Sequence, residues 1–205
     1  MAMELVGERW SLLIVRELMF GPRRFNELKN GLPGVSANVL TQRLEGMEAS
    51  GILTRRKLPP PASVQVYELT PLGYSAETVI KELGRWAAQS PLHDPTLPLS
   101  AASIMLSFRT MLSAGRAEGI DARIGFRFGD EHFIAHLAGG EIVIRRGETD
   151  GADLTFTGTP VALAGAIYGG QSLDALGRAG ALSVVGDTRL AERFTTLFPL
   201  PAKLG

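Results

Sequence analysis

Residues 34–53 read GVSANVLTQRLEGMEASGIL, and this stretch decides the fold of the first half of the chain. It opens at a Pro33-Gly34 turn signal, and Ser36 is of the type that caps helix N-termini. Apolar residues then recur at the i, i+4, i+7 spacing of a buried helical stripe: Leu40, Leu44 and Met47. The pattern predicts an amphipathic helix that runs to about Ala49 and is ended by Gly51.

The opposite face of this helix is polar. A step of about 100° per residue directs four side chains away from the stripe: Asn38, Thr41, Gln42 and Glu45. Arg43 lies nearer the rim, with a side chain long enough to reach outward. Asn and Gln can pair bidentately with adenine, and Arg with guanine or phosphate, in a major groove that admits a helix. A solvated surface helix is polar too, so the neighbouring segments have to decide between these readings.

Those neighbours follow a recognisable order. An amphipathic helix is predicted from Leu5 to about Phe20, and a short helix over Arg24–Leu32 precedes the turn. After the quoted stretch, Ile52–Lys57 and Val64–Leu69 are β-rich segments joined by a proline-rich tip. A last helix begins at Thr70-Pro71, with an apolar side made of Leu72, Val79, Leu83 and Trp86. Helices with a tight turn before the third, followed by a two-stranded ribbon, predict a winged helix-turn-helix.

Charge is distributed in agreement with that prediction. The formal net charge of the whole chain is zero, but residues 20–60 carry seven Lys or Arg against three Asp or Glu, a net +4. A local cationic excess is what a phosphate-facing surface needs. The residues that we expect to contact DNA are Arg23, Arg24, Ser36, Asn38, Thr41, Gln42, Arg43, Arg55, Arg56 and Lys57.

Residues 5–88 also resemble a known family. The elements that carry the resemblance are VGERWSLLI, GPRRFNEL, LPGVS, LTQRL and YELTPLG, in this order. They are similar to the HxlR-type branch of the MarR-like winged-helix transcription regulators. The resemblance implies a homodimer formed mainly through the first and last helices of this domain, on a palindromic operator in double-stranded DNA. Many members carry a cysteine just before the first helix; this chain has none, so a thiol is not expected to receive its signal.

Composition bounds the remaining possibilities. The chain of 205 residues is long enough for one large or two small domains with real cores. It contains no cysteine, which excludes disulfides and thiolate nucleophiles or metal ligands. No apolar window approaches the ~20 residues of a membrane span, and charged residues interrupt the early apolar run. We therefore expect a cytoplasmic protein that has no contact with membranes.

The organisation changes near Ser90. Residues 90–100, SPLHDPTLPLS, hold three prolines without periodicity and predict a linker between a winged-helix domain (1–89) and a second domain (101–205). The second half reads as a helix (100–116), four short strands of which the first, ARIGFRF (122–128), alternates strictly, a helix from Thr159-Pro160, a fifth strand (LSVVGD) and a closing helix (188–198). The predicted fold class is α+β: a five-stranded sheet with one face under helices.

No catalytic, metal or cofactor site emerges from this half. His132 and His136 share a strand face, but four residues at ~3.3 Å rise separate them by about 13 Å, too far for one metal ion. The glycines from Gly169 to Gly180 lack the preceding strand of a phosphate-binding loop. Without a nucleophile–base pair, we expect no enzyme.

Large apolar side chains are frequent in the second half, either as ordinary core or as the lining of a ligand cavity. The motifs ADLTFTGTPVALAGAIYGG and GALSVVGDTRLAERFTTLF resemble the sterol carrier protein type 2 family, which implies an apolar tunnel for lipids. The candidate ligand-binding residues are Phe108, Met111, Phe126, Phe128, Phe156, Ile167 and Phe194. The hypothesis is a dimeric regulator that responds to an apolar ligand; the alternatives are a ligand-free dimerisation or interaction module, or a lipid carrier.

Overall fold

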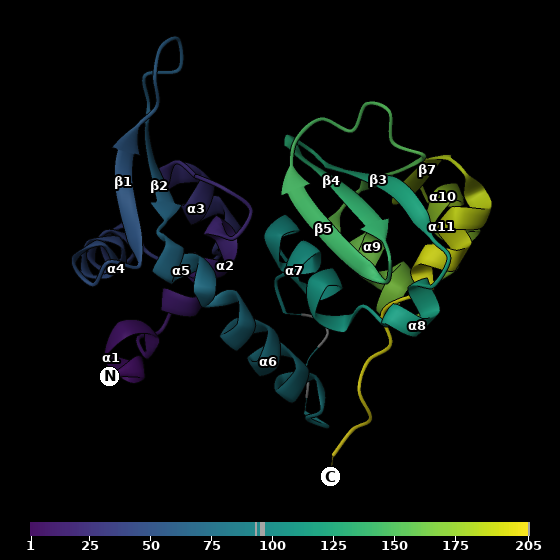
Figure 1. Cartoon of the computed structure of the whole chain (residues 1–205), viewed down its shortest axis with the longest axis horizontal. Helices are drawn as coiled ribbons and strands as arrows, with labels where there is room; N and C mark the ends of the chain where they lie inside the picture. Colours follow the sequence, from purple (N-terminus) through teal and green to yellow (C-terminus); the bar gives the residue numbers. More distant parts are fainter. Residues whose placement is uncertain (93, 95–96, 205) are drawn as a thin grey trace. The chain divides into compact units, whose positions relative to one another are not determined.

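The computed structural model describes residues 1–92, 94 and 97–204, and the chain forms two compact units, residues 1–82 and 83–205 (Figure 1). The expected linker over residues 90–100 includes His93, Pro95 and Thr96, which lie outside the described residues. The domain limits expected from the sequence, at residues 89 and 101, therefore stay predictions. Within the described ranges, no helix has both the length and the apolar character needed to cross a bilayer.

The first unit is helical apart from a two-stranded ribbon. Its elements are α1 (Ala2–Val6), α2 (Ser11–Leu18), α3 (Phe25–Gly31), α4 (Ala37–Ala49), β1 (Leu53–Lys57), β2 (Gln65–Leu69), α5 (Pro71–Ser75) and α6 (Glu77–Ala88), which continues into the second unit. The predicted stripe of α4, Leu40, Leu44 and Met47, is buried. It packs in a core with α2 and α3, to which Ile14, Leu18 and Leu28 contribute. The expected helix-turn-helix and ribbon are therefore confirmed.

The single helix predicted from Leu5 to Phe20 is wrong, because the chain breaks it between α1 and α2. Gly7 is a poor helix former, and Trp10 adopts a left-handed backbone conformation with φ of 82° before α2 begins. This break brings the Trp10 indole beside the α3–α4 turn, where a Cβ added at Gly34 would lie 3.7 Å from its Cη2 atom. Apolar periodicity alone could not reveal this break, since apolar residues recur at helical spacing on both sides of it.

The turn that orients α4 follows the sequence prediction. Gly34 has a φ of +91°, a region in which other residues are strained. Ser36 then caps the helix, since its Oγ accepts a hydrogen bond from the main-chain N–H of Val39 at 3.2 Å. Such a cap contributes about 1 kcal/mol to helix stability. The start of α4 is thus determined locally.

The ribbon joins the helical core at its base. Strands β1 and β2 pair antiparallel from Leu53↔Leu69 to Lys57↔Gln65. Thr70 closes the base, with its Oγ1 donating to the carbonyl of Gly51 at 2.6 Å and accepting from the N–H of Gly73. A Cβ at Gly73 would lie 2.1 Å from the Ile52 carbonyl oxygen, so this close approach requires glycine.

The second unit contains the five-stranded sheet that the sequence predicted. Its elements are α7 (Ala101–Met111), α8 (Ala114–Ala117), β3 (Asp121–Phe128), β4 (Glu131–Ala138), β5 (Glu141–Arg146), β6 (Leu154–Gly158), α9 (Pro160–Tyr168), α10 (Leu173–Arg178), β7 (Leu182–Gly186) and α11 (Thr188–Thr195). The strand order is β5-β4-β3-β6-β7, with β3 and β6 parallel and all other pairs antiparallel.

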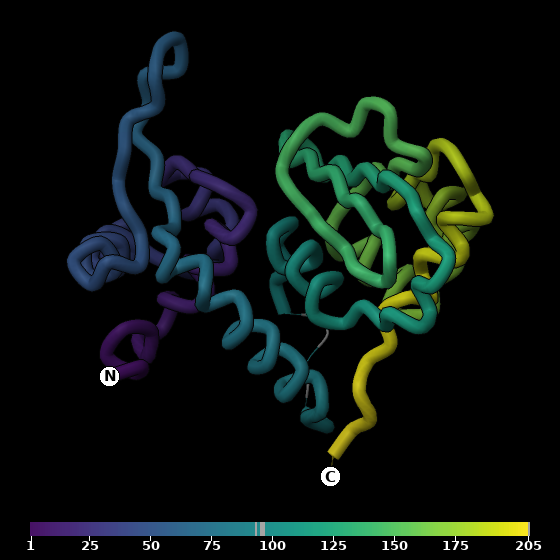
Figure 2. Tube along the Cα trace, viewed as in Figure 1, coloured from purple at the N-terminus to yellow at the C-terminus, as the bar shows by residue number. Residues whose placement is uncertain are grey.

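The core of this unit lies between one face of the sheet and the helices. Phe126 on β3 contacts Phe108 from α7 and Phe194 from α11, with ring centroids 5.7 and 5.8 Å apart. Figure 2 traces the backbone of this unit and of the segment that follows α11. The α+β class is confirmed, with the helical layer over the face of the sheet that carries Ile124, Phe126 and Phe128. Along β3 buried and exposed residues alternate except at Gly125, which is also buried.

Candidate nucleic-acid interface

The outer face of α4 carries the side chains that the sequence predicted to read DNA. Asn38, Thr41, Gln42 and Glu45 are exposed, while Leu40 and its stripe lie in the core. Arg43 is half-buried, and its guanidinium lies 3.2 Å from the carboxylate of Glu8. The structure therefore presents amide and hydroxyl groups along one helical face, as direct readout of base edges requires.

The ribbon presents a second, cationic surface. In β1 only Leu53 is buried, and the residues from Thr54 to Lys57 are exposed. An open hollow of about 490 Å³ lies along the ribbon and is lined by Arg55, Arg56, Lys57, Ser63 and Gln65. Three cations and two neutral hydrogen-bonding side chains form a lining suited to a phosphate backbone.

Two of these cations have carboxylate partners. Arg55 lies 3.2 Å from Glu48, near the end of α4, and Arg56 pairs with Glu68 on β2. The hydrogen bond and the charge of Glu68 raise the pKa of Arg56, so its guanidinium is charged throughout the physiological range. Exposed pairs of this kind contribute little to stability because solvent screens them, so a phosphate can compete for the same guanidinium groups.

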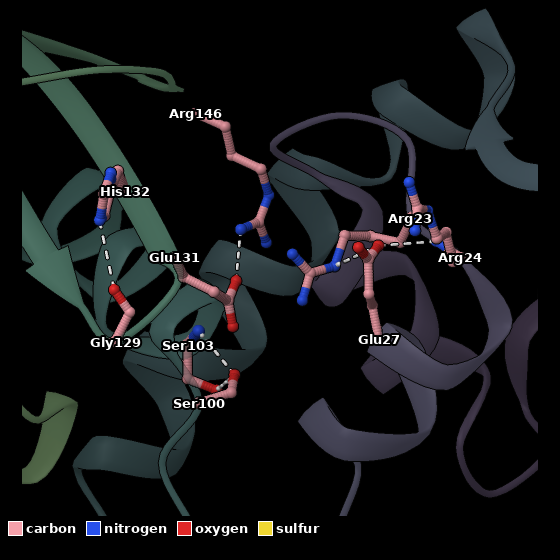
Figure 3. A network of polar contacts seen from close by, with 9 residues as sticks. All are labelled: Arg23, Arg24, Glu27, Ser100, Ser103, Gly129, Glu131, His132 and Arg146. Atoms are coloured by element: carbon pink, nitrogen blue, oxygen red, sulfur yellow. Dashed lines mark hydrogen bonds and ion pairs between the residues drawn. The ribbon is translucent and has the colours of Figure 1, made fainter. Parts of the chain in front are cut away.

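Arg23 and Arg24 at the start of α3 are held by Glu27, as Figure 3 shows. The Glu27 carboxylate accepts from the main-chain N–H of Arg24 at 2.8 Å and lies 3.7 Å from Nε of Arg23. Arg23 also exchanges main-chain hydrogen bonds of 2.9 and 2.8 Å with Tyr67 of β2. Arg24 is exposed. We therefore expect Arg24 to be available to a phosphate, and Arg23 to attach the ribbon to α3.

Sequence reasoning missed several members of this surface. Ser63 and Gln65 also line the hollow, and the β1–β2 register pairs Gln65 with Lys57. Glu8, Glu48 and Glu68 were missed as partners of the arginines, because each pair joins residues from separate elements. The polar Gln65 directly before the buried Val66 was the one available signal.

In the second unit, the candidate ligand-binding rings contact one another. Phe108, Phe126, Phe156 and Phe194 are fully buried, and Phe126 lies 5.9 Å from Phe156 between ring centroids. Phe128 joins the same cluster, 6.3 Å from Phe126, and Met111 is half-buried. Ile167 is the candidate that lines an open space, a pocket of about 200 Å³ near the ends of α9 and α11. Five of the seven residues are thus rings of a packed core, Ile167 lines a pocket, and Met111 is half-buried.

The two histidines of β4 lie on the outer face of the sheet, each with its own carboxylate. His132 Nδ1 lies 3.4 Å from Glu148, and His136 Nε2 lies 2.9 Å from Asp121. Within the part of the chain that the structure describes, no three His, Asp or Glu side chains gather in a metal-binding arrangement. Both histidines act as surface residues of the sheet.

Comparison with known proteins assigns the first half of the chain to a family. Residues 5–93 match the HxlR-like helix-turn-helix family. The HTH-type transcriptional regulator YodB of Bacillus subtilis is 38% identical over 88 residues, which cover 43% of this chain and 79% of YodB. The uncharacterized regulator YvaP of the same organism is 33% identical, over 43% of this chain and 82% of YvaP. The solved structure of reduced YodB is 35% identical and covers 45% of this chain and 91% of that chain, with a TM-score of 0.42.

The second half matches a different family from the one expected. Residues 98–203 match the alkyl sulfatase C-terminal family, in place of the sterol carrier protein type 2 family suggested by the motifs. The solved sec-alkylsulfatase Pisa1 from Pseudomonas sp. is 22% identical with a TM-score of 0.43; the match covers 47% of this chain but only 16% of that enzyme. The chain therefore belongs to the HxlR-like helix-turn-helix transcription regulators through residues 5–93, and to the alkyl sulfatase C-terminal family through residues 98–203.

Proposed function

We propose that the chain is a dimeric transcription regulator that inserts α4 into the major groove and lays its ribbon along the DNA backbone. The observation that carries the proposal is the division of α4 into a buried apolar stripe and an exposed face with Asn38, Thr41 and Gln42. The cationic hollow on the ribbon supplies contacts that position a protein without reading sequence. The regulators that share this family support the same role.

The dimer is proposed to form through α6 together with α1. Only Ala88 of α6 is buried, whereas Val79, Leu83 and Trp86 on one side of the helix are 52, 42 and 70% exposed. In α1, Met3 is 71% exposed. Exposed apolar side chains of this size on one side of a helix are typical of an interaction surface. A two-fold dimer would present two copies of α4 to half-sites about 34 Å apart.

The second unit is proposed to make DNA binding responsive to a ligand. Its fully buried ring cluster provides a rigid body, because interiors at this packing density transmit displacement instead of absorbing it. Ligand control requires that the ligand bind one state of the dimer more tightly than another. A ligand held in this unit would act on DNA through α6, the helix that the two units share.

The test is a selection of DNA fragments bound by the full chain, followed by affinity measurement on the selected sequence. We expect a palindrome whose half-sites are separated by about one helical turn, bound by two chains. A chain with Asn38→Ala and Gln42→Ala should retain weak binding and lose the preference for that palindrome. Enrichment of no sequence, or enrichment that is unchanged in this variant, would contradict the proposal.

A further inference from the structure

A pocket of about 200 Å³ opens in the second unit between the C-terminal ends of α9 and α11. Its eight lining residues combine one cation, three hydroxyl groups and an apolar wall, and include no carboxylate: Arg116, Ile167, Tyr168, Thr195, Thr196, Phe198, Pro199 and Leu200. Drug-sized ligands occupy ~300–1,000 Å³, so this pocket suits a smaller molecule. Such a lining suits a molecule that has an anionic end and an apolar body.

The polar side of the pocket is organised by two interactions. Arg116 on α8 donates from Nη1 to the main-chain carbonyl of Thr196 at 2.7 Å. This hydrogen bond orients a guanidinium that has five N–H donors. Tyr168 Oη lies 2.9 Å from Ser107 Oγ. Burial raises the pKa of Tyr168 to about 12, so the phenol stays neutral. Because Ser107 Oγ donates to the carbonyl of Ile104 at 2.8 Å, the phenol donates its proton to Ser107.

The apolar side of the pocket is continuous with the ring cluster. Phe198 is buried, and its ring lies 4.5 Å from that of Phe108 between centroids. Ile167 forms the α9 wall, and Leu200 is 44% exposed at the edge. A hydrocarbon chain or an aromatic ring placed here would cover the exposed part of Leu200 and pack against the edges of the buried Ile167 and Phe198.

We propose that this pocket binds a small amphipathic carboxylate, with the carboxylate on Arg116 and the apolar body against Ile167, Phe198 and Leu200. A charge-assisted hydrogen bond from a guanidinium is among the stronger polar contacts in proteins. The inference rests on the proposed function in one respect: it names the ligand class and the position for the ligand-responsive role of this unit. The ligand is thereby placed at the edge of the pocket and not among the packed rings.

The C-terminal segment of the chain connects the pocket wall to the end of α6. Residues 198–200 begin the C-terminal segment, in which Lys203 donates from Nζ to the carbonyls of Ala88 at 2.9 Å and Ser90 at 3.0 Å. The N–H of Leu204 donates to the carbonyl of Gln89 at 2.8 Å. A cation at the C-terminal end of a helix is favourable for its unpaired carbonyls and its dipole. A ligand that displaces Leu200 therefore acts, within four residues, on the end of α6 beside Trp86.

The binding test is calorimetric titration of the full chain with octanoate and with benzoate, which distinguish a chain from a ring as the apolar body. Octanol and octylammonium are the comparators without the negative charge. We expect one saturable site per chain for at least one carboxylate, and affinity at least about tenfold weaker for both comparators, as loss of a charge-assisted hydrogen bond predicts. Arg116→Gln should weaken carboxylate binding by a similar factor, whereas Arg189→Gln, an exposed arginine on α11, should not.

Leu200→Glu supplies a second variant at an exposed position, and it should repel the carboxylate without disturbing the core. Equal affinity for octanol, or carboxylate binding that neither Arg116→Gln nor Leu200→Glu weakens, would overturn the site, as would the absence of saturable binding. The DNA measurement is separate. If carboxylate binding depends on Arg116 but no operator is found, the site stands and the regulator proposal fails. If an operator is found and its affinity is the same with the pocket saturated or with Lys203→Gln, the route through α6 is wrong.

Discussion

Glu48 on α4 binds Arg55 on β1 through two contacts, one to the main chain and one to the side chain. Its Oε1 accepts from the main-chain N–H of Arg55 at 3.2 Å, and its Oε2 lies 3.2 Å from the Arg55 guanidinium. The carboxylate thus connects the C-terminal part of the helix that we propose to read DNA with the base of the ribbon. In the proposed complex with DNA it would compete with phosphate for the same guanidinium.

Glu48→Gln is therefore expected to raise affinity for DNA of any sequence, because the variant removes one negative charge and releases Arg55. Arg55→Ala should lower affinity for all sequences and reduce the salt slope by about one. Binding measured over a series of salt concentrations tests both variants, with Glu192→Gln on α11 as the matched change in net charge. If Glu48→Gln and Glu192→Gln behave alike, the competition between Glu48 and phosphate is refuted.

Asn38→Ala combined with Gln42→Ala is expected to remove base discrimination. Each lost bidentate contact should reduce the distinction between the right and the wrong base by ~1–3 kcal/mol. Affinities for the selected operator and for a scrambled duplex provide the measurement. Asn26→Ala, an exposed asparagine on α3, is the control and should keep the preference. A double variant that still discriminates as the wild type does would show that α4 does not read the bases.

Trp86→Glu should convert the dimer to a monomer, since a carboxylate would have to be desolvated in the apolar face of α6. The side chain is 70% exposed in one chain, so the fold should survive the change. Sedimentation equilibrium gives the mass in solution. Val161→Glu places the same charge at an exposed valine of α9 and should leave the mass unchanged. Dimeric Trp86→Glu protein would exclude α6 from the interface.

Phe126→Ala is expected to destabilise the chain by ~3–5 kcal/mol, the cost typical of truncating a fully packed ring. Phe126 is fully buried and contacts rings from α7, β6 and α11. Val143→Ala, at an exposed position of β5, should change the free energy of unfolding by less than about 0.5 kcal/mol. Chemical denaturation followed by circular dichroism compares the two. A small cost for Phe126→Ala would mean that this ring borders open space.

Alkaline pH should destabilise the wild type more than Tyr168→Phe. Burial raises the pKa of Tyr168 from its ordinary value of 10.0 to about 12. Below pH ~10 both the folded and the unfolded chain keep this proton, so its contribution is fully present; between ~10 and ~12 only the unfolded chain loses it, and stability falls as pH rises. The difference is at most about 3 kcal/mol. Urea unfolding at two pH values on either side of this window measures it, and parallel curves for the two proteins would contradict the assignment.

Much of the fold could be predicted because its determinants are local. Ser36 caps α4, and Leu40, Leu44 and Met47 lie in one helical phase, so the helix and its outward face follow from neighbours within a few turns. The alternation of apolar side chains at Ala122, Ile124, Phe126 and Phe128 likewise determines which side chains of β3 enter the core. The break at Trp10 could not be predicted, because the apolar residues keep a helical spacing across it. The short helix α10 could not be predicted either, because the apolar spacing around it is weak.

By itself, the sequence determined the helix-turn-helix and ribbon, the α+β class of the second half and the exposed face of α4, since capping and periodicity act between residues close in the chain. Only the tertiary structure decided which arginines meet carboxylates, which aromatic rings pack together and where a pocket remains. Arg55 finds Glu48 across the base of the ribbon, and Arg116 meets Thr196 eighty positions later. Such pairs depend on how elements distant in sequence pack, and no local pattern records that packing.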